Sequence, residues 1–317
     1  YLRMPLLQER DIILFDYRGT GRSTNLPCDN IGIESWKDLM ADLTIDEFDR
    51  NQTKRYEDCI TEMEKEGIDY NRYGMNNLAR DAAFLAQQLP YDTYNLFGIS
   101  YGTMAIQHFI RATENYDITV RSAIVDSSVP IATPTQGTMA TYYERSLLNV
   151  LSDCEKNAEC NTAYPDLKKR YITFLDTLKE KPIQFTMDDG NQAYINKQEI
   201  NAIVHQLLYN ERVYPNIPLL LERIMQHDTE VIRKMIPTMK GKVETSYNAT
   251  GLVEYVYDHK ISTARSKTTY EKNIASSIFQ VVDGYLDYYY QDKNILLDSI
   301  ANTPINTQIP TLLLAGS

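Results

Sequence analysis

The sequence Gly98-Ile-Ser-Tyr-Gly102 decides the fold of this chain of 317 residues. The Gly-x-Ser-x-Gly pattern alone is weak evidence, because Gly and Ser are common residues. Its surroundings strengthen it. Residues 94–98 are a short apolar run typical of a buried strand, and residues 101–112 have the apolar spacing of an amphipathic helix. A serine between a strand and a helix indicates a nucleophile elbow, whose hydroxyl projects above a sheet.

The elbow predicts a role for each residue of the motif. Ser100 is the expected nucleophile, held in a strained turn where the helix dipole favours a developing oxyanion. The backbone N–H of Tyr101 is an expected donor to that oxyanion. Gly98 and Gly102 are expected because a Cβ at either position would clash with the neighbouring strand and helix. The alternative is a plain strand–turn–helix corner in which Ser100 only caps the helix.

A serine nucleophile needs a general base, and the base needs an orienting acid. His108 lies two helical turns beyond Ser100, about 12 Å along the helix axis, and is expected not to reach its hydroxyl. Asp126 ends a predicted strand at the same sheet edge and is a candidate acid, but a turn-capping role is favoured for it. Surface or packing roles are expected for the other histidines, which are His205, His227 and His259.

The pattern around the motif alternates between strands and helices, which predicts right-handed crossovers and a parallel sheet. Beyond it, helical patterns dominate until a final apolar run returns to the sheet. We therefore expect an α/β fold, with 1–129 as the first part of a core, 130–304 as a mainly helical cap and 305–317 as the return to the sheet. The predicted strands are residues 11–16, 94–98, 120–125 and 310–315. The predicted helices are residues 76–89, 101–112, 142–151, 166–179, 197–209, 217–226 and 272–290, with a hairpin over 183–195.

Composition excludes two classes of protein. The formal net charge of −11 repels phosphate backbones and argues against nucleic-acid binding. No apolar run approaches the roughly 18 residues of a membrane span. The chain begins at Tyr1 and ends directly after the apolar run 310–315, so we expect a protein cut at both ends.

The four cysteines permit three pairings. Their spacing does not resemble a zinc site, and no metal or other cofactor is expected. Two local pairs, Cys28–Cys59 and Cys154–Cys160, are the simplest arrangement; four buried free thiols in a cytosolic protein are the alternative. Disulfides would indicate an exported protein, in the periplasm or outside the cell.

Together these residues resemble the prolyl and tripeptidyl aminopeptidase family of α/β-hydrolases. The resemblance rests on Asp16-Tyr-Arg-Gly-Thr-Gly-Arg-Ser23, on residues 98–103, on Asp126-Ser-Ser-Val-Pro130 and on the helix over residues 78–85. The cysteines are similar to those of the exported, tripeptidyl-aminopeptidase-like branch. In the first motif Asp16, Arg18, Gly19 and Gly21 are expected to form a scaffold turn rather than to catalyse.

The resemblance also implies which parts of the site lie elsewhere. The family carries a His-Gly-Gly-Pro-Gly loop ahead of the first predicted strand, and its catalytic Asp and His follow a strand like residues 311–317. Only Ser100 of the triad can be carried over, so we expect the catalytic Asp and His outside this chain and the fragment itself to be inactive.

Three functions remain open from the sequence. The leading one is a serine aminopeptidase that releases N-terminal residues or short peptides from substrates with a free N-terminus, whose amine a cap carboxylate would bind. The second is a carboxylesterase on the same scaffold, since fold does not determine substrate. The third is a non-catalytic binding protein of the same fold.

Overall fold

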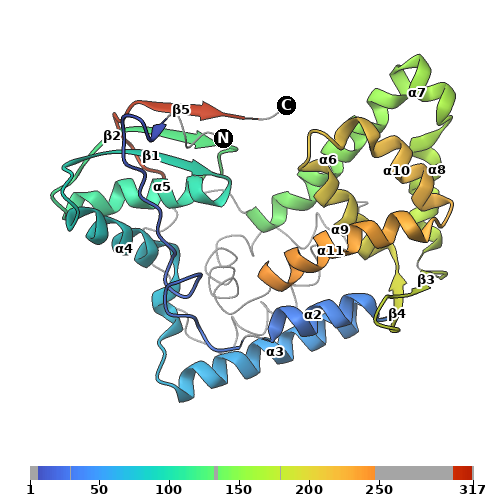
Figure 1. Ribbon diagram of the computed structural model, residues 1–317, viewed down its shortest axis with the longest axis horizontal. Helices are drawn as coiled ribbons and strands as arrows, with labels where there is room; N and C mark the ends of the chain where they lie inside the picture. Colours follow the sequence, from blue (N-terminus) through green and yellow to red (C-terminus); the bar gives the residue numbers. More distant parts are fainter. Residues whose placement is uncertain (1–5, 29, 132–134, 179, 247–302, 316–317) are drawn as a thin grey trace. The chain divides into compact units, whose positions relative to one another are not determined.

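The computed structural model describes residues 6–315, apart from 29, 132–134, 179 and 247–302 (Figure 1). His259 and the predicted helix 272–290 therefore lie outside the described residues. The chain forms two compact units. Unit 1 comprises Tyr1–Pro27, Ile68–Thr133 and Leu297–Ser317, and unit 2 comprises Cys28–Gly67 and Pro134–Leu296.

Unit 1 contains, in the described residues, a parallel sheet with the strand order β1–β2–β5. Each strand lies where the sequence predicted one, and the parallel pairing predicted from the strand–helix alternation is confirmed. The register places the last residues of the three strands side by side, so their carboxyl ends form one edge. The strands are β1 (Thr93–Ile99), β2 (Thr119–Asp126) and β5 (Thr311–Leu314).

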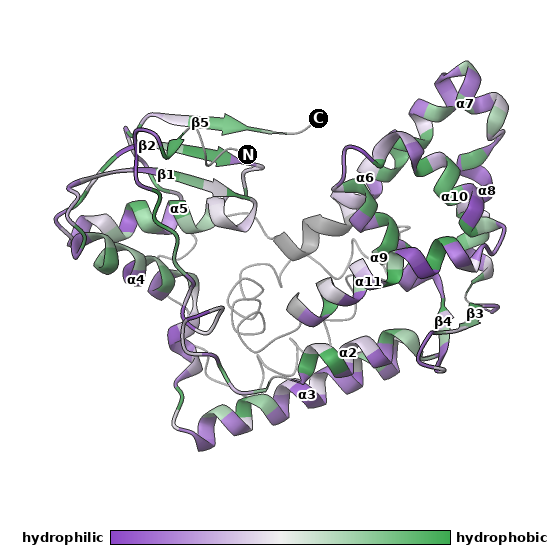
Figure 2. Cartoon of the chain, viewed as in Figure 1, coloured by the Kyte–Doolittle hydropathy of each residue, from purple (hydrophilic) through white to green (hydrophobic). Residues whose placement is uncertain are grey.

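Two helices, α4 (Met75–Gln87) and α5 (Tyr101–Ala112), lie on the same side of this sheet (Figure 1). Buried alanines of both helices cluster between them, and these short side chains allow a close approach. Ile106 of α5 packs against buried side chains of β2, and Figure 2 shows the strands as mainly hydrophobic. The short 3₁₀ helices η1 (Tyr70–Tyr73) and η2 (Thr113–Asn115) complete the unit's described helices.

The predicted buried strand over residues 11–16 is wrong. The structure assigns no strand there, and Leu14 is 68% and Phe15 41% exposed. A strand is stable only when its backbone N–H and C=O groups pair with a neighbour, and within the described sheet this segment joins no strand pair. An apolar run therefore was not sufficient to make a strand.

The described residues of unit 2 are mainly helical, which is the character that the sequence predicted for the part of 130–304 that they cover. Its predicted hairpin is confirmed, with β3 (Ile183–Thr186) antiparallel to β4 (Gln192–Ile195). The four predicted helices that fall on described residues correspond to α6, α8, α9 and α10. The described helices are α2 (Ile31–Met40), α3 (Ile45–Lys65), α6 (Thr135–Lys156), α7 (Ala158–Ala163), α8 (Leu167–Thr177), α9 (Lys197–Leu208), α10 (Ile217–Met225) and α11 (Thr229–Ser246), with the 3₁₀ helix η3 (Tyr214–Asn216).

The core of unit 2 draws on two distant parts of the sequence. Trp36 and Leu39 of α2 belong to the same buried cluster as Leu147 of α6 and Leu221 of α10. A Cβ at Gly32 of α2 would lie 2.6 Å from the carbonyl oxygen of Glu244 in α11, so the two backbones are in close contact. Residues 28–67 thus pack with described residues of the segment 134–246. The sequence suggested instead a cap that begins at residue 130, and the functional division into core and cap stays a proposal.

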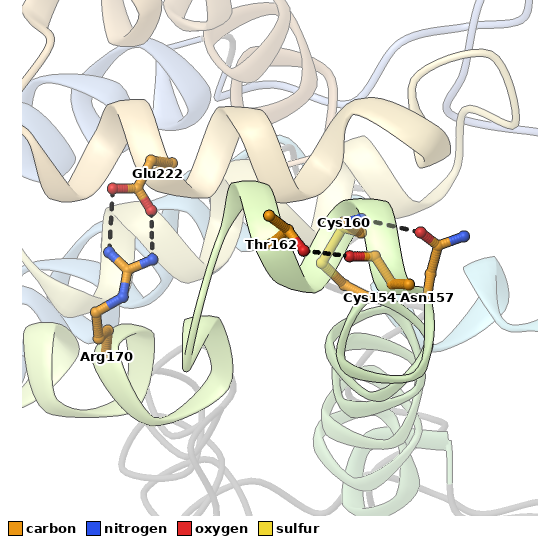
Figure 3. The surroundings of a disulfide bond; sticks show 7 residues. Cys154, Asn157, Cys160, Thr162, Arg170 and Glu222 are labelled. Atoms are coloured by element: carbon orange, nitrogen blue, oxygen red, sulfur yellow. Dashed lines mark hydrogen bonds and ion pairs between the residues drawn. A yellow bond between two sulfur atoms is a disulfide. The ribbon is translucent and has the colours of Figure 1, made fainter.

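The predicted cysteine pairing agrees with the structure. Disulfides join Cys28 to Cys59 and Cys154 to Cys160, with Cα atoms 5.5 and 5.1 Å apart. Figure 3 shows the second bond, which ties the end of α6 to α7, where the Asn157 side chain accepts the N–H of Cys160 at 2.9 Å. Beside it, an Arg170–Glu222 pair joins α8 to α10 through two hydrogen bonds of 3.0 and 2.6 Å.

Two helices of unit 2 begin with the same reciprocal cap in different surroundings. At α3, the Glu47 carboxylate accepts the N–H of Thr44 at 2.9 Å, and Glu47 is exposed. At α9, the Glu199 carboxyl group accepts the N–H of Asn196 at 3.0 Å, but Glu199 is only 3% exposed. Burial raises the pKa of Glu199 from 4.5 to about 8, whereas hydrogen bonds from Thr44 lower the pKa of Glu47.

Removal of each disulfide by a double Cys→Ser substitution should destabilise the protein in proportion to the loop that the bond closes. The chain-entropy relation gives about 3–4 kcal/mol for Cys28–Cys59 and about 2 kcal/mol for Cys154–Cys160. Urea unfolding under oxidising conditions measures both values. An equal loss from the two variants would contradict the loop-length argument.

The substitution Glu199→Gln should make the protein's stability less sensitive to pH. Folded Glu199 keeps its proton up to about pH 8, whereas the unfolded chain releases it near 4.5, so its contribution to stability is lost as pH rises between those values. Each unit of pKa shift corresponds to about 1.4 kcal/mol. Urea unfolding at about pH 5 and about pH 8 should show wild type losing more stability than the variant.

The matched control is Glu47→Gln, at the exposed cap. The pKa of Glu47 is lowered, so its contribution is already constant above its unfolded value, and the variant should follow the wild-type pH dependence in this range. A Glu199→Gln curve parallel to wild type would show that burial of Glu199 has no such effect.

Candidate active site

Ser100 has the backbone conformation that the elbow requires. It joins the last residue of β1 to the first residue of α5 with φ 51° and ψ −120°, and Ser100 is exposed to solvent. A positive φ is uncommon for a residue with a Cβ, and such a conformation costs of order 1–3 kcal/mol. Contacts with surrounding residues must therefore stabilise this conformation of Ser100. Backbone strain of this kind is found most often at functional sites.

Gly98 is a position where no side chain fits. A Cβ there would lie 2.5 Å from the carbonyl oxygen of Gly102 and 2.8 Å from Cδ1 of Ile106. The first contact is with backbone, which cannot rotate away as a flexible side chain can. The expected clash at Gly98 is therefore present, and it follows from the first turn of α5 passing close to the end of β1.

The expected clash at Gly102 is wrong. A Cβ at Gly102 would meet nothing within 4 Å other than its chain neighbours and the local backbone of α5. The asymmetry arises because Gly102 approaches Gly98 with its carbonyl group, so a Cβ on Gly102 points elsewhere. Only one of the two motif glycines is required by close packing.

The end of β2 lies beside the elbow. The N–H of Ser100 donates to the carbonyl oxygen of Asp126 at 2.9 Å, so the two strand ends are joined through the backbone. The next residue, Ser127, has φ 56° and donates its N–H to Leu314 of β5 and its hydroxyl to Asp126 Oδ1 at 3.1 Å. Asp126 thus contributes its backbone carbonyl to the elbow and its carboxylate to the Ser127 hydroxyl, and the turn-capping role favoured from the sequence stays a prediction.

The described histidines have packing partners. His108 is buried in α5, and its Nδ1 lies 2.6 Å from Oδ1 of Asn76 at the start of α4. In unit 2, His205 lies edge-on between Tyr143 and Tyr209, with ring centroids 5.5 and 5.1 Å away, and burial lowers its pKa. His227 packs edge-on against Phe174. These contacts agree with the expected packing roles.

The predicted scaffold turn is held through the side chains of Asp16 and Arg18. The Asp16 carboxylate accepts the N–H of Arg22 at 2.8 Å, and Gly21, with φ 55°, lies so close that a Cβ would be 2.4 Å from Cγ of Asp16. Gly19 also has a positive φ, of 81°. Arg18 forms a two-pronged pair with Asp81 of α4 at 2.6 and 2.5 Å.

Asp81 was not singled out from the sequence. Asp16 and Arg18, which the sequence assigned together to the scaffold turn, have separate partners in the structure. Arg18 also donates to the carbonyl oxygen of Arg72 at 2.9 Å, so it connects the turn both to α4 and to the preceding helix η1. Because α4 also carries Arg80 and several polar side chains, its pattern does not distinguish Asp81.

In the described ranges, no group of three or more His, Cys, Asp or Glu residues is arranged to hold a metal ion. No helix among them has both the length and the apolar character needed to cross a membrane.

Two single-residue variants test the asymmetry of the motif glycines. Gly98→Ala should destabilise the protein by about 1–3 kcal/mol or more, because its methyl group would overlap the Gly102 carbonyl. Gly102→Ala should be neutral or stabilising by up to about 1 kcal/mol, because alanine favours a helix more than glycine does. Thermal or urea unfolding of both variants makes the comparison, and equal destabilisation would contradict it.

A comparison with known protein families identifies the fold family of this chain. Residues 4–166, slightly more than half of the chain, match the family model of the alpha/beta hydrolase fold. The match includes Ser100, both strands β1 and β2 and the helices α4 and α5. A search of curated proteins finds no match. With a parallel sheet, its crossover helices and the strained Ser100 turn within the matched segment, the chain belongs to the alpha/beta hydrolase fold family.

Proposed function

We propose that this hydrolase is a serine hydrolase in which Ser100 is the nucleophile. The observation that supports this most strongly is the conformation of Ser100, an exposed serine with a positive φ at the carboxyl edge of a parallel sheet. A plain helix cap needs no such strain, since capping serines adopt ordinary extended conformations. Here the Ser100 side chain also makes no capping hydrogen bond to the first turn of α5.

The reaction we propose is acyl transfer. Ser100 Oγ attacks the substrate carbonyl carbon while a histidine general base, oriented by a carboxylate, takes the hydroxyl proton. The resulting oxyanion lies at the N-terminus of α5, where the Tyr101 N–H and the helix dipole stabilise negative charge. The protonated base then gives its proton to the leaving amine, the C–N bond breaks, and water hydrolyses the acyl ester.

Within this class we propose an aminopeptidase that acts on peptides with a free N-terminus. Its support is the likeness of the residue 16–23 turn, the elbow and the segment after β2 to the prolyl and tripeptidyl aminopeptidase family. The same likeness implies that a carboxylate of the predicted cap binds the substrate amine. The two disulfides support an exported location, since such bonds persist in oxidising compartments.

Hydrolysis by the full-length protein, with and without Ser100→Ala, tests the proposal. The protein is assayed against aminoacyl and tripeptidyl p-nitroanilides and p-nitrophenyl esters, and labelled with a fluorophosphonate probe. Wild type should cleave the amides, and Ser100→Ala should abolish labelling and lower kcat by about four to six orders of magnitude.

Ser127→Ala is the matched control. Ser127 is also exposed, has a positive φ and follows the neighbouring strand, so its substitution should leave kcat and labelling near the wild-type values. Ester cleavage without amide cleavage would replace the aminopeptidase by a carboxylesterase. Undiminished activity of Ser100→Ala, or wild type with neither labelling nor turnover, would refute the serine hydrolase.

A further inference from the structure

The hydroxyl of Thr103 is fully buried and makes two hydrogen bonds at once. Thr103 is 0% exposed in the first turn of α5. Its Oγ1 donates to the carbonyl oxygen of Ser100 at 2.6 Å and accepts the backbone N–H of Val129 at 2.8 Å. A threonine hydroxyl has one proton to donate, a carbonyl only accepts and an N–H only donates, so the direction of both bonds is determined.

The first of these bonds holds the strained residue itself. The Ser100 carbonyl also accepts the N–H of Thr103 at 2.9 Å, and the Ser100 N–H donates to the Asp126 carbonyl at 2.9 Å. The peptide groups on both sides of Ser100 are thus bonded to neighbours. A residue in a sparsely populated conformation persists only where its surroundings determine it in this way.

The second bond closes a ring around the elbow. The Val129 N–H bonds to the Thr103 hydroxyl, and that hydroxyl bonds to the Ser100 carbonyl. The Ser100 N–H in turn bonds to the Asp126 carbonyl, and the chain from Asp126 to Val129 completes the ring. Gln107, one turn along α5, reinforces this ring. Its Nε2 donates to the Val129 carbonyl at 2.8 Å and to the Thr103 carbonyl at 3.0 Å, and its Oε1 accepts the N–H of Ile131 at 3.3 Å.

We propose that Thr103 is a positioning residue for Ser100, whose hydroxyl keeps the Ser100 peptide in the orientation that aims the nucleophile. This inference rests on the proposed function of Ser100. Thr103 acts on the backbone of Ser100, so it influences the chemical step and leaves substrate binding largely unaffected. Gln107 supports it by holding residues 129–131 against α5.

The test is Thr103→Val in the full-length protein, because valine keeps the shape of threonine and removes the hydroxyl. We expect kcat to fall about 10- to 100-fold, as misplacement of a reacting group does, while KM changes little. The rate constant for fluorophosphonate labelling should fall by the same factor. Thr103→Ser, which restores the hydroxyl, should recover most of the lost activity.

The matched control is Thr113→Val at the other end of α5. The Thr113 hydroxyl donates to the Ile110 carbonyl at 2.7 Å, which is the same local bond to a residue three positions earlier, but it has no link to Ser100 in the described contacts. Its substitution should leave kcat and labelling unchanged. A folded Thr103→Val with wild-type kcat would overturn the inference, as would a loss that Thr103→Ser does not recover.

A second variant covers the case in which Thr103→Val does not fold. Gln107→Met removes the bonds that hold residues 129–131 against α5, so the Val129 N–H no longer fixes the Thr103 hydroxyl in its bond to Ser100. The variant should therefore lower kcat at an unchanged KM, and wild-type kcat would overturn the inference. Ser100→Ala separates the two proposals. If that variant keeps its activity, the serine hydrolase itself fails. If it is inactive while the Thr103 and Gln107 variants behave as wild type, only the positioning role fails.

Discussion

The carbonyl oxygen of Gly102 lies where a Cβ at Gly98 would need space, and the rest of the elbow depends on this contact between two backbones. It brings the first turn of α5 against the end of β1, so the chain must reverse within one residue. That residue is Ser100, and its positive φ is the result. The same close approach brings Ile106 against Ala123 and Val125 of β2. The turn at Ser100 and the packing of α5 on the sheet therefore depend on each other.

The parallel register then determines what stands beside the serine. Because β1, β2 and β5 end together, the carbonyl of Asp126 is in place to accept the Ser100 N–H, and Leu314 is in place to hold the residue after Asp126. β5 is separated from β2 in the sequence by most of unit 2, yet it completes this edge. The strained serine is therefore supported by the first turn of α5, by the end of β2 and, from far along the chain, by β5.

The local motifs of unit 1 could be predicted from the sequence because short-range patterns determine them. The strand before Ser100, the helix after it and the serine between them were predicted together, and so were the cysteine pairs of unit 2. Long-range contacts were not accessible in this way. The apolar run at residues 11–16 looks like a strand, but it has no strand partner in the described sheet. Residues 25–72 have a polar, irregular pattern that indicates only a charged helical stretch around residues 58–65. The structure forms α2 and the longer α3 there, and both belong to unit 2.

The sequence by itself determined that the chain has a strand–serine–helix elbow in a parallel sheet, because glycine, serine and apolar spacing act over a few residues. Tertiary structure alone decided which groups hold that elbow, since Thr103, Gln107 and Val129 meet only when α5 packs beside the end of β2. The two capping glutamates show the same division. Glu47 and Glu199 have equivalent local roles, yet their pKa values shift in opposite directions, because only the packing of unit 2 removes Glu199 from water.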